Sequence, residues 1–223
     1  MTGRLAEPGQ DPAITPVAED YLKAIWSAPE WGGPPATVSS LATRFGTTRA
    51  TVSATLARLS ERGLVRHERY KAIDLSVSGR RLAVDMVRRH RLIETYLVQT
   101  LGYAWDEVHD EAERLEHAVS DSFIERIDVL LGHPRADPHG DPIPSAGGET
   151  AYPPDAVMLR DAGDGRYRVV RVSDSSPETL HAAVRHGLTP GASLTLDPVS
   201  RRALTRALKD PSAVVLVPAA GSS

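Results

Sequence analysis

The segment TVSSLATRFGTTRATVSATLARLSERGLVRHERYKAIDLSVSG, residues 37–79, decides the fold of the N-terminal part of this chain. Apolar residues recur at helical spacing over about 37–46 and 47–63, and each of these two helices ends at a glycine. Two short β-prone runs around a charged turn follow over 64–79. A further amphipathic helix is expected around 17–26. Helix, helix, turn, helix and a two-stranded wing is the order of a winged helix-turn-helix.

The charge of this segment favours DNA as its partner. Residues 37–81 contain nine Lys or Arg and three Asp or Glu, a local charge of +6, although the whole chain carries −3. A recognition helix needs small or polar residues at its N-terminal end, with basic or hydroxyl groups beside them for phosphates. The alternative is a winged helix used only for protein contacts. The residues expected to contact double-stranded DNA lie in the third helix and the wing: Thr48, Arg49, Ala50, Thr51, Ser53, Ala54, Arg66, Arg69 and Lys71.

The middle of the chain is expected to be helical and its end partly β. Periodic apolar positions indicate helices over about 78–101, 105–119 and 122–132, the last with a capping box from Ser122 to Glu125. A Pro- and Gly-rich stretch follows, and beyond it three β-prone runs surround one short helix, about Pro177 to His186. We expect a mainly α protein with small β parts in three domains: 1–81 winged helix-turn-helix, 82–150 helical with a Pro/Gly-rich linker, and 151–223 partly β.

The composition excludes several kinds of site. The 223 residues are 41% hydrophobic and 25% charged, as in an ordinary soluble globular protein. There is no cysteine, which excludes disulfides, thiolate metal ligands and a cysteine nucleophile. No apolar run approaches the roughly 20 residues of a membrane span, and the N-terminus has no apolar signal region. We therefore expect a cytoplasmic protein.

Acidic and histidine side chains gather in the predicted helices of the middle domain. Residues 104–128 contain nine Asp or Glu and two Arg, a local charge of −7. In this region and the helix before it, spacings of three and four place the following residues on common helix faces: His90 with Glu94, then His109, Glu113, Glu116 and His117. Carboxylates packed beside a buried stripe repel one another, and a divalent cation removes this penalty. The pattern predicts a metal site.

The segments VRRHRLIETYLVQTLGYAWDEVHDEAERLEHAVSD, residues 87–121, and HPRADPHGDPIP, residues 133–144, resemble the diphtheria toxin repressor family of metal-dependent regulators. AEDYLKAIW, residues 18–26, resembles the first helix of its manganese-sensing branch. The resemblance implies a C-terminal SH3-like (FeoA-like) domain. It also implies a primary, activating site made by Asp20, Glu113, Glu116 and His117, and an ancillary site made by His90, Glu94 and His109. Some three-domain relatives lend a ligand from the C-terminal domain, and Glu178 is the nearest candidate by position.

Two departures from family patterns bear on the metal. Iron-type members have Met and Cys where this chain has Asp20 and Glu113, and replacing sulfur by oxygen shifts the preference towards Mn²⁺. Smaller manganese regulators have a Glu three residues after the first-helix Asp, where this chain has Lys23, so their two-metal arrangement is not expected. The resemblance thus implies a manganese-activated repressor, not an enzyme, that represses metal-homeostasis genes and also binds Fe²⁺, Co²⁺ or Zn²⁺ in vitro.

Repressors of this kind bind palindromic operators as homodimers. The apolar stripes of the middle helices offer more surface than one small module can bury, so a second copy is expected to cover them. These stripes are Leu82, Met86, Ile93, Leu97 and Leu101, with Phe123, Ile127, Leu130 and Leu131 on the later helix.

Three alternatives stay open at this point. An iron-activated regulator of the same family keeps the architecture and changes the metal. A winged-helix regulator that senses an organic ligand has a merely structural acidic cluster. A di-iron carboxylate enzyme also uses Glu and His on paired helices, but the Glu-x-x-His pair that such sites repeat is absent.

Overall fold

A computed structural model describes residues 14–67, 71–145 and 147–219. The chain divides into two compact units, 1–83 and 84–223, and the boundary falls within the long helix α4 (Val77–Leu101). The structure is mainly α-helical with two small sheets, which confirms the predicted fold class. No helix among the described residues is both long and apolar enough to cross a membrane.

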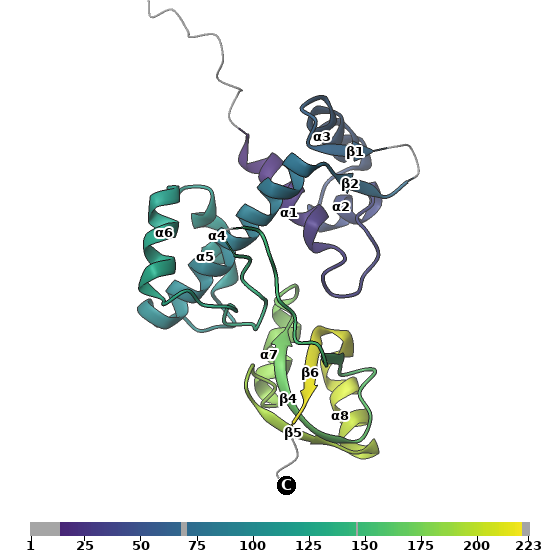
Figure 1. Ribbon diagram of the computed structural model, residues 1–223. Coiled ribbons are helices and arrows are strands. Elements are labelled where there is room, and N and C mark those ends of the chain that lie inside the picture. Colours follow the sequence, from purple (N-terminus) through teal and green to yellow (C-terminus); the bar gives the residue numbers. More distant parts are fainter. Residues whose placement is uncertain (1–13, 68–70, 146, 220–223) are drawn as a thin grey trace, which may run out of the picture. The chain divides into compact units, whose positions relative to one another are not determined.

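The first unit has the predicted order of a winged helix-turn-helix (Figure 1). It contains α1 (Pro16–Ser27), α2 (Val38–Arg44), α3 (Arg49–Glu61) and the antiparallel wing strands β1 (Val65–His67) and β2 (Ile73–Leu75). A threonine caps each of the three helices, because the side chains of Thr15, Thr37 and Thr48 accept hydrogen bonds from backbone N–H groups of the first turn. These caps explain where the helices begin.

The core of this unit is apolar and tight. Leu22, Leu41 and Leu56 are fully or almost fully buried, and the aromatic rings of Tyr21 and Phe45 stack with their centroids 4.5 Å apart. Gly79, in the first turn of α4, lies against the backbone just before β1, since an added Cβ there would lie 1.9 Å from the Leu64 carbonyl oxygen.

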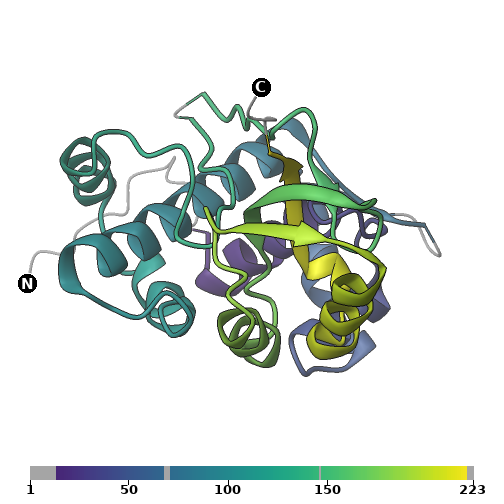
Figure 2. The same cartoon turned by 90° about the horizontal axis from the view of Figure 1, so that it is seen from below.

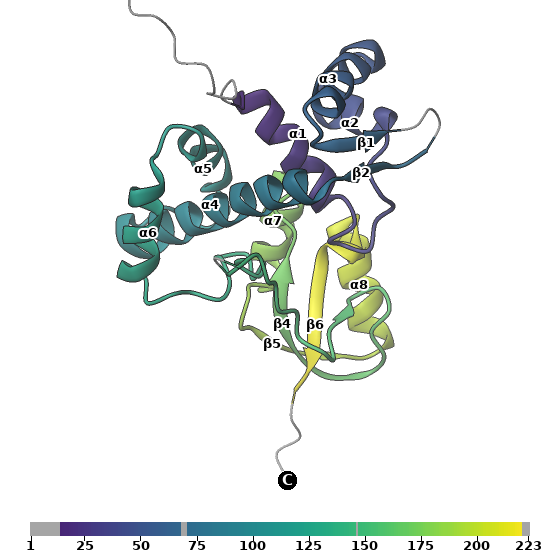
Figure 3. The same cartoon turned by 45° about the horizontal axis from the view of Figure 1, so that its top comes forward.

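The helical part of the second unit consists of α4 from residue 84 onward, α5 (His109–Glu116) and α6 (Asp121–Leu130), as Figure 3 shows. Helix α5 is shorter than predicted, because residues 105–107 form a turn. The predicted capping box at Ser122 is wrong: the N-cap is Ser120, which has extended backbone and accepts a hydrogen bond from the Phe123 N–H.

The predicted apolar stripe is divided between the inside and the outside of the chain. Ile93, Leu97 and Ile127 are buried in the core of their own unit. The large apolar side chains that remain exposed near the end of α4 and on α6 are Leu101, Phe123, Val129 and Leu130. The apolar surface left for a second copy to cover is therefore smaller than the sequence pattern indicates.

The C-terminal part is a four-stranded antiparallel sheet with two helices around one core (Figure 2). Its strand order is β3-β6-β4-β5. The elements are β3 (Val157–Met158), β4 (Gly165–Val172), α7 (Pro177–Arg185), β5 (Ser193–Leu196), α8 (Pro198–Leu208), a 3-10 turn (Pro211–Ala213) and β6 (Val214–Pro218). The three β-prone runs and α7 were predicted, whereas α8 and β3 were not.

Candidate metal centre

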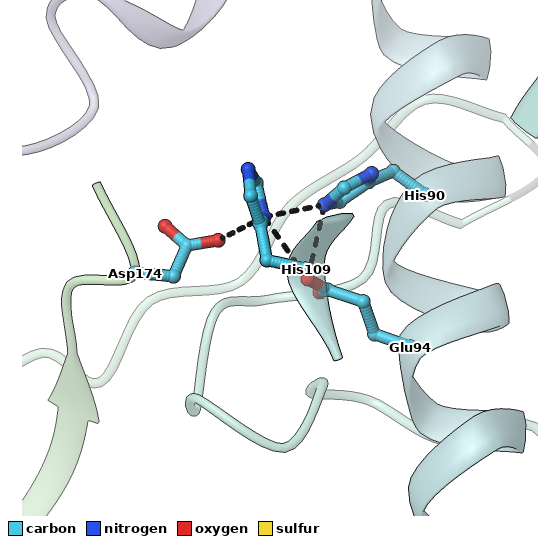
Figure 4. A group of neighbouring side chains, drawn as sticks. All are labelled: His90, Glu94, His109 and Asp174. Carbon is cyan, nitrogen blue, oxygen red and sulfur yellow. Dashed lines mark hydrogen bonds and ion pairs between the residues drawn. The ribbon is translucent and has the colours of Figure 1, made fainter. Parts of the chain in front are cut away.

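Two helices and one loop bring four side chains together in the second unit (Figure 4). His90 and Glu94 lie one turn apart on α4, His109 begins α5, and Asp174 follows β4. His90 Nε2 lies 3.0 Å from Glu94 Oε1 and 3.2 Å from His109 Nδ1. His109 Nδ1 lies 3.3 Å from Glu94 Oε1 and 3.0 Å from Asp174 Oδ2. One ligand atom from each of the four side chains lies within 4.8 Å of all the others.

The two α4 residues of this group are buried. Glu94 is 0% exposed and His90 is 5% exposed. The second ring nitrogen of His90, Nδ1, lies 2.5 Å from Glu116 Oε2, and Glu116 is also buried. A carboxylate on the far nitrogen of a metal-ligating histidine fixes its tautomer and orientation. The contact therefore leaves His90 Nε2 as the atom that is available to a cation.

A second group shares Glu94 and includes Asp137 and His139. His139 Nε2 lies 2.6 Å from the carbonyl oxygen of Trp105, to which it donates, so its Nδ1 carries the lone pair in the neutral ring. Glu94 Oε2 and His139 Nδ1 face each other at 3.8 Å, both buried and both without a hydrogen-bond partner. Two buried acceptors that face each other need a positive charge between them, which a proton on His139 supplies in the metal-free protein and a bound cation can replace. The donor set and these two atoms fit a divalent metal ion.

The charges of the group are strongly coupled. Burial raises the pKa of Glu94, but His90, His109 and His139 outweigh it and hold that pKa well below its usual range. Burial lowers the pKa of His109, but hydrogen bonds with Asp174, Glu113 and Glu94 raise it to about 12. In the same way the contacts of His139 with Glu94 overcome its burial and raise its pKa to about 9. Without metal, protons on the imidazoles balance the carboxylates.

Asp137 and Asp174 respond in opposite directions. Burial and the neighbouring Asp141 raise the pKa of Asp137 well above its usual value. Burial also raises the pKa of Asp174, but the hydrogen bond with His109 outweighs it and lowers the pKa to about 2. Asp174 is therefore a carboxylate at neutral pH, as a metal ligand must be.

The other residues of the predicted primary site lie on α5 and α1. Glu116 is buried, Glu113 is exposed with its Oε1 3.5 Å from His109 Nε2, and His117 is the C-cap of α5. Asp20 is partly buried on α1 of the other unit. The i+4 spacing of His109 and Glu113 brings these two side chains together on α5, and His117 follows at the end of the helix.

The structure does not bring Glu178, the predicted C-terminal ligand, into this group. Glu178 is exposed on α7, and its carboxylate lies 2.8 Å from Lys209 Nζ. Asp174, four residues earlier, takes the position beside His109. Sequence reasoning also missed Asp137 and His139, although both lie in the quoted segment HPRADPHGDPIP, where an acid and a histidine two residues apart were the available signal.

The candidate DNA-contacting residues of α3 and its cap all lie on an exposed face. These are Thr48, Arg49, Ala50, Thr51, Ser53 and Ala54, whereas Val52, Leu56 and Leu59 point into the core. Arg66 and Lys71 of the wing are exposed. Arg69 lies outside the described residues.

Two family models match adjacent parts of the chain. The iron-dependent repressor N-terminal DNA-binding domain matches residues 13–73, and the iron-dependent repressor metal-binding and dimerisation domain matches residues 76–145. The iron-dependent repressor IdeR of Mycobacterium leprae is 31% identical over 188 residues, 84% of this chain and 78% of its own length. The diphtheria toxin repressor of Corynebacterium diphtheriae is 33% identical over 189 residues, 78% of this chain and 83% of its own length.

Solved structures extend the likeness to the whole fold. A manganese-dependent transcriptional repressor in complex with manganese is 41% identical, with a TM-score of 0.77, and the match covers 91% of this chain and all of that one. The manganese regulator SloR is 29% identical, with a TM-score of 0.73, over 92% of this chain and all of that one.

Proposed function

This chain belongs to the iron-dependent repressor family, to which the diphtheria toxin repressor also belongs, and on that premise we propose that it is a manganese-activated transcriptional repressor. It acts in the cytoplasm as a homodimer on palindromic operators of metal-homeostasis genes. The family consists of DNA-binding regulators, not enzymes. The observation that carries the metal dependence is the group of His90, Glu94, His109 and Asp174, of which the first two are buried, together with the facing buried atoms Glu94 Oε2 and His139 Nδ1.

The donor atoms favour manganese over softer metals. The candidate ligands are carboxylates and imidazoles, and the sequence contains no cysteine. Carboxylate oxygens suit Mn²⁺, whereas thiolates select softer ions. An iron-activated regulator is the second candidate, because the relatives include iron-dependent repressors. Raw affinity follows the general order of divalent metals, so selectivity must appear in the activation of DNA binding.

The chain's own residues divide the work between ligation and DNA contact. The family resemblance assigns Asp20, Glu113, Glu116 and His117 to an activating site and His90, Glu94 and His109 to an ancillary site, to which we add Asp174, Asp137 and His139. A bound divalent cation supplies the positive charge that carboxylates such as Glu94 and Asp174 otherwise take from protonated histidines. Asp20 lies on α1 of the DNA-binding unit. The ligand set that the family resemblance implies, Asp20, Glu113, Glu116 and His117, therefore couples metal binding to DNA binding.

Operator binding across a metal series tests this proposal. An operator is selected from a random pool of double-stranded DNA with Mn²⁺-loaded protein, and binding is then titrated with Mn²⁺, Fe²⁺, Co²⁺ and Zn²⁺ without oxygen. We expect activation by Mn²⁺ in the concentration range where the site fills. Equal operator affinity of chelated and Mn²⁺-loaded protein contradicts a metal switch. Activation by Fe²⁺ at much lower free concentration than Mn²⁺ favours the second candidate.

A further inference from the structure

The sequence DPHGD, residues 137–141, forms a tight turn that closes on itself, and we refer to it as the DPHGD turn. Asp137 Oδ1 accepts hydrogen bonds from the backbone N–H groups of His139 and Asp141, at 2.8 and 2.9 Å. The backbones of Asp137 and Asp141 are also joined, since the Asp137 N–H donates to the Asp141 carbonyl oxygen at 3.0 Å. The turn therefore presents His139 in a fixed orientation.

The turn lies directly against strand β4. The Val172 N–H donates to the His139 carbonyl oxygen at 2.9 Å. Gly140 has a φ of +86°, and a Cβ there would lie 1.8 Å from the Val170 carbonyl oxygen, so only glycine allows this approach. Between these two contacts, Arg171 donates from Nε to Asp141 Oδ1 at 2.6 Å, and its Nη2 contacts the same oxygen. Arg171 and Asp141 are each 4% exposed.

Helix α4 contacts the same turn through Arg91. Its Nη1 donates to the Pro142 carbonyl oxygen at 2.7 Å, and its Nε lies 3.6 Å from Asp137 Oδ2. Its Nη2 lies 3.8 Å from Asp141 Oδ2. One arginine of the helical part and one arginine of the sheet thus converge on one turn. A buried charge left without its partner is costly, so loss of either arginine should weaken this junction.

The DPHGD turn and β4, which meet at this junction, each lead to candidate metal ligands. The turn contains Asp137 and His139, and Asp174 is three residues after Arg171 along the chain. We propose that the Arg171–Asp141 ion pair is a positioning pair, which fixes β4 on the DPHGD turn and thereby holds Asp174, the ligand that follows β4, at the metal centre. This inference rests on the proposed metal-binding function, and Arg171 acts only through the ligand that it positions.

A calorimetric titration of the full chain with Mn²⁺ tests the role of the ion pair. In Arg171→Gln we expect the Mn²⁺ that uses Asp174 to bind roughly 10- to 100-fold more weakly, the range known for residues that orient metal ligands. Arg168→Gln is the matched control, because Arg168 is on the same strand but exposed. Arg171→Lys keeps the charge but loses the two-point contact, and its affinity should lie between those of Arg171→Gln and the unmodified chain. Asp174→Asn removes the ligand itself.

The combination Arg171→Gln with Asp174→Asn separates positioning from a general loss of structure. Because Arg171 acts through Asp174, we expect the Mn²⁺ affinity of the double variant to lie within about twofold of that of Asp174→Asn alone. A double variant that is weaker by the full factor of Arg171→Gln overturns the proposal. So does an Arg171→Gln variant with the Mn²⁺ affinity of the Arg168→Gln control.

Hydrogen exchange of the Val172 amide in metal-free protein gives a readout that does not depend on metal. We expect exchange at least tenfold faster in Arg171→Gln and unchanged exchange in Asp174→Asn and Arg168→Gln. Unchanged exchange in Arg171→Gln shows that the ion pair does not fix β4 on the turn. If the unmodified chain fails to bind Mn²⁺ while exchange responds as expected, the proposed function fails and the junction stands as structural only.

Discussion

At the scale of single residues, the two histidines with raised pKa values show what a metal ion must displace. His109 has a pKa of about 12 and His139 a pKa of about 9, so both imidazoles are protonated at pH 7.5 in metal-free protein. A nitrogen must lose its proton before it can ligate a metal. Metal binding at this centre is therefore an exchange of protons for a cation.

We predict that Mn²⁺ binding at this centre releases protons and becomes tighter as the pH rises. At pH 7 both His109 and His139 contribute a proton. Above about pH 9 His139 has already lost its proton, so only His109 still contributes. Anaerobic calorimetry in buffers of different ionisation enthalpy, at pH 7 and pH 9.5, counts the protons. His139→Gln should release one proton fewer at pH 7, and its proton release should be the same at pH 7 and pH 9.5. Equal proton release at both pH values in the unmodified chain contradicts the prediction.

A second residue prediction concerns the choice of metal. Glu113→Cys places a thiolate where the family resemblance puts a primary-site carboxylate, and soft ligands favour Fe²⁺ or Co²⁺ over Mn²⁺. We expect the concentration of Co²⁺ needed for operator binding to fall relative to that of Mn²⁺ by about tenfold or more. Asp110→Cys, exposed on the same helix, is the control. An unchanged ratio in Glu113→Cys means that Glu113 is not a ligand.

At the scale of elements, helix α3 presents two different faces. Val52, Leu56 and Leu59 are buried, while the residues at its N-terminal end are exposed and mostly small, hydroxylic or basic. The buried residues give the periodicity from which the helix was predicted. The exposed residues are available to base edges and phosphates. Changes on the exposed face should therefore leave the fold intact.

Arg49→Ala and Thr51→Ala should each weaken operator binding without changing Mn²⁺ affinity or the oligomeric state. The expected loss is about 1–3 kcal/mol for a base contact, and loss of a phosphate contact by Arg49 should lower the salt slope by about one unit. Arg58→Ala, at the other end of α3, is the control. Operator titrations at several salt concentrations provide both numbers. Normal affinity and slope in both variants would place the reading surface elsewhere.

Elements with regular apolar spacing were predicted, and those that depend on caps were not. Helix α8 was not predicted because its sequence PVSRRALTRAL has few large apolar residues. Asp197 as N-cap and Pro198 as the first helical residue nevertheless mark a helix start. The N-cap of α6 was misplaced by two residues, because Ser120 and Ser122 are both plausible caps and only the backbone conformation distinguishes them. Local sequence thus determines the type of an element better than its ends.

The metal centre was predictable only as far as single helices carry it. His90 with Glu94, and His109 with Glu113, are pairs at i+4, so helical geometry alone brings each pair together. Asp174 and His139 reach the centre through the contact of β4 with a loop that is about 30 residues distant in sequence. No local pattern encodes that contact, which is why Glu178 was expected instead of Asp174.

At the scale of the whole molecule, the exposed apolar side chains identify the surface for a second copy. Val129 and Leu130 of α6 are 66% and 65% exposed, and Leu101 at the end of α4 is 55% exposed. Exposed apolar groups of this size on one helical module indicate an interface. The family model that matches these residues is a metal-binding and dimerisation domain, so we predict that a second copy covers them in a two-fold dimer.

Leu130→Glu should dissociate the dimer while the chain stays folded. A central apolar interface residue is worth about 2 kcal/mol or more, so the dissociation constant should rise roughly 30-fold or more. Val199→Glu is the control, because Val199 is also exposed and apolar but lies on α8. Sedimentation of the full chain over a range of concentrations provides the measurement. An unchanged dimer in Leu130→Glu moves the interface away from α6.

The nitrogen and oxygen donors of the metal centre have a consequence for oxidative stress. Peroxide converts accessible thiolates to sulfenic acid and then to states that no longer bind metal. With no cysteine in its sequence, this chain has no such ligand to lose. Carboxylates and imidazoles do not undergo thiol oxidation. Metal-dependent DNA binding by this chain should therefore be insensitive to thiol oxidation.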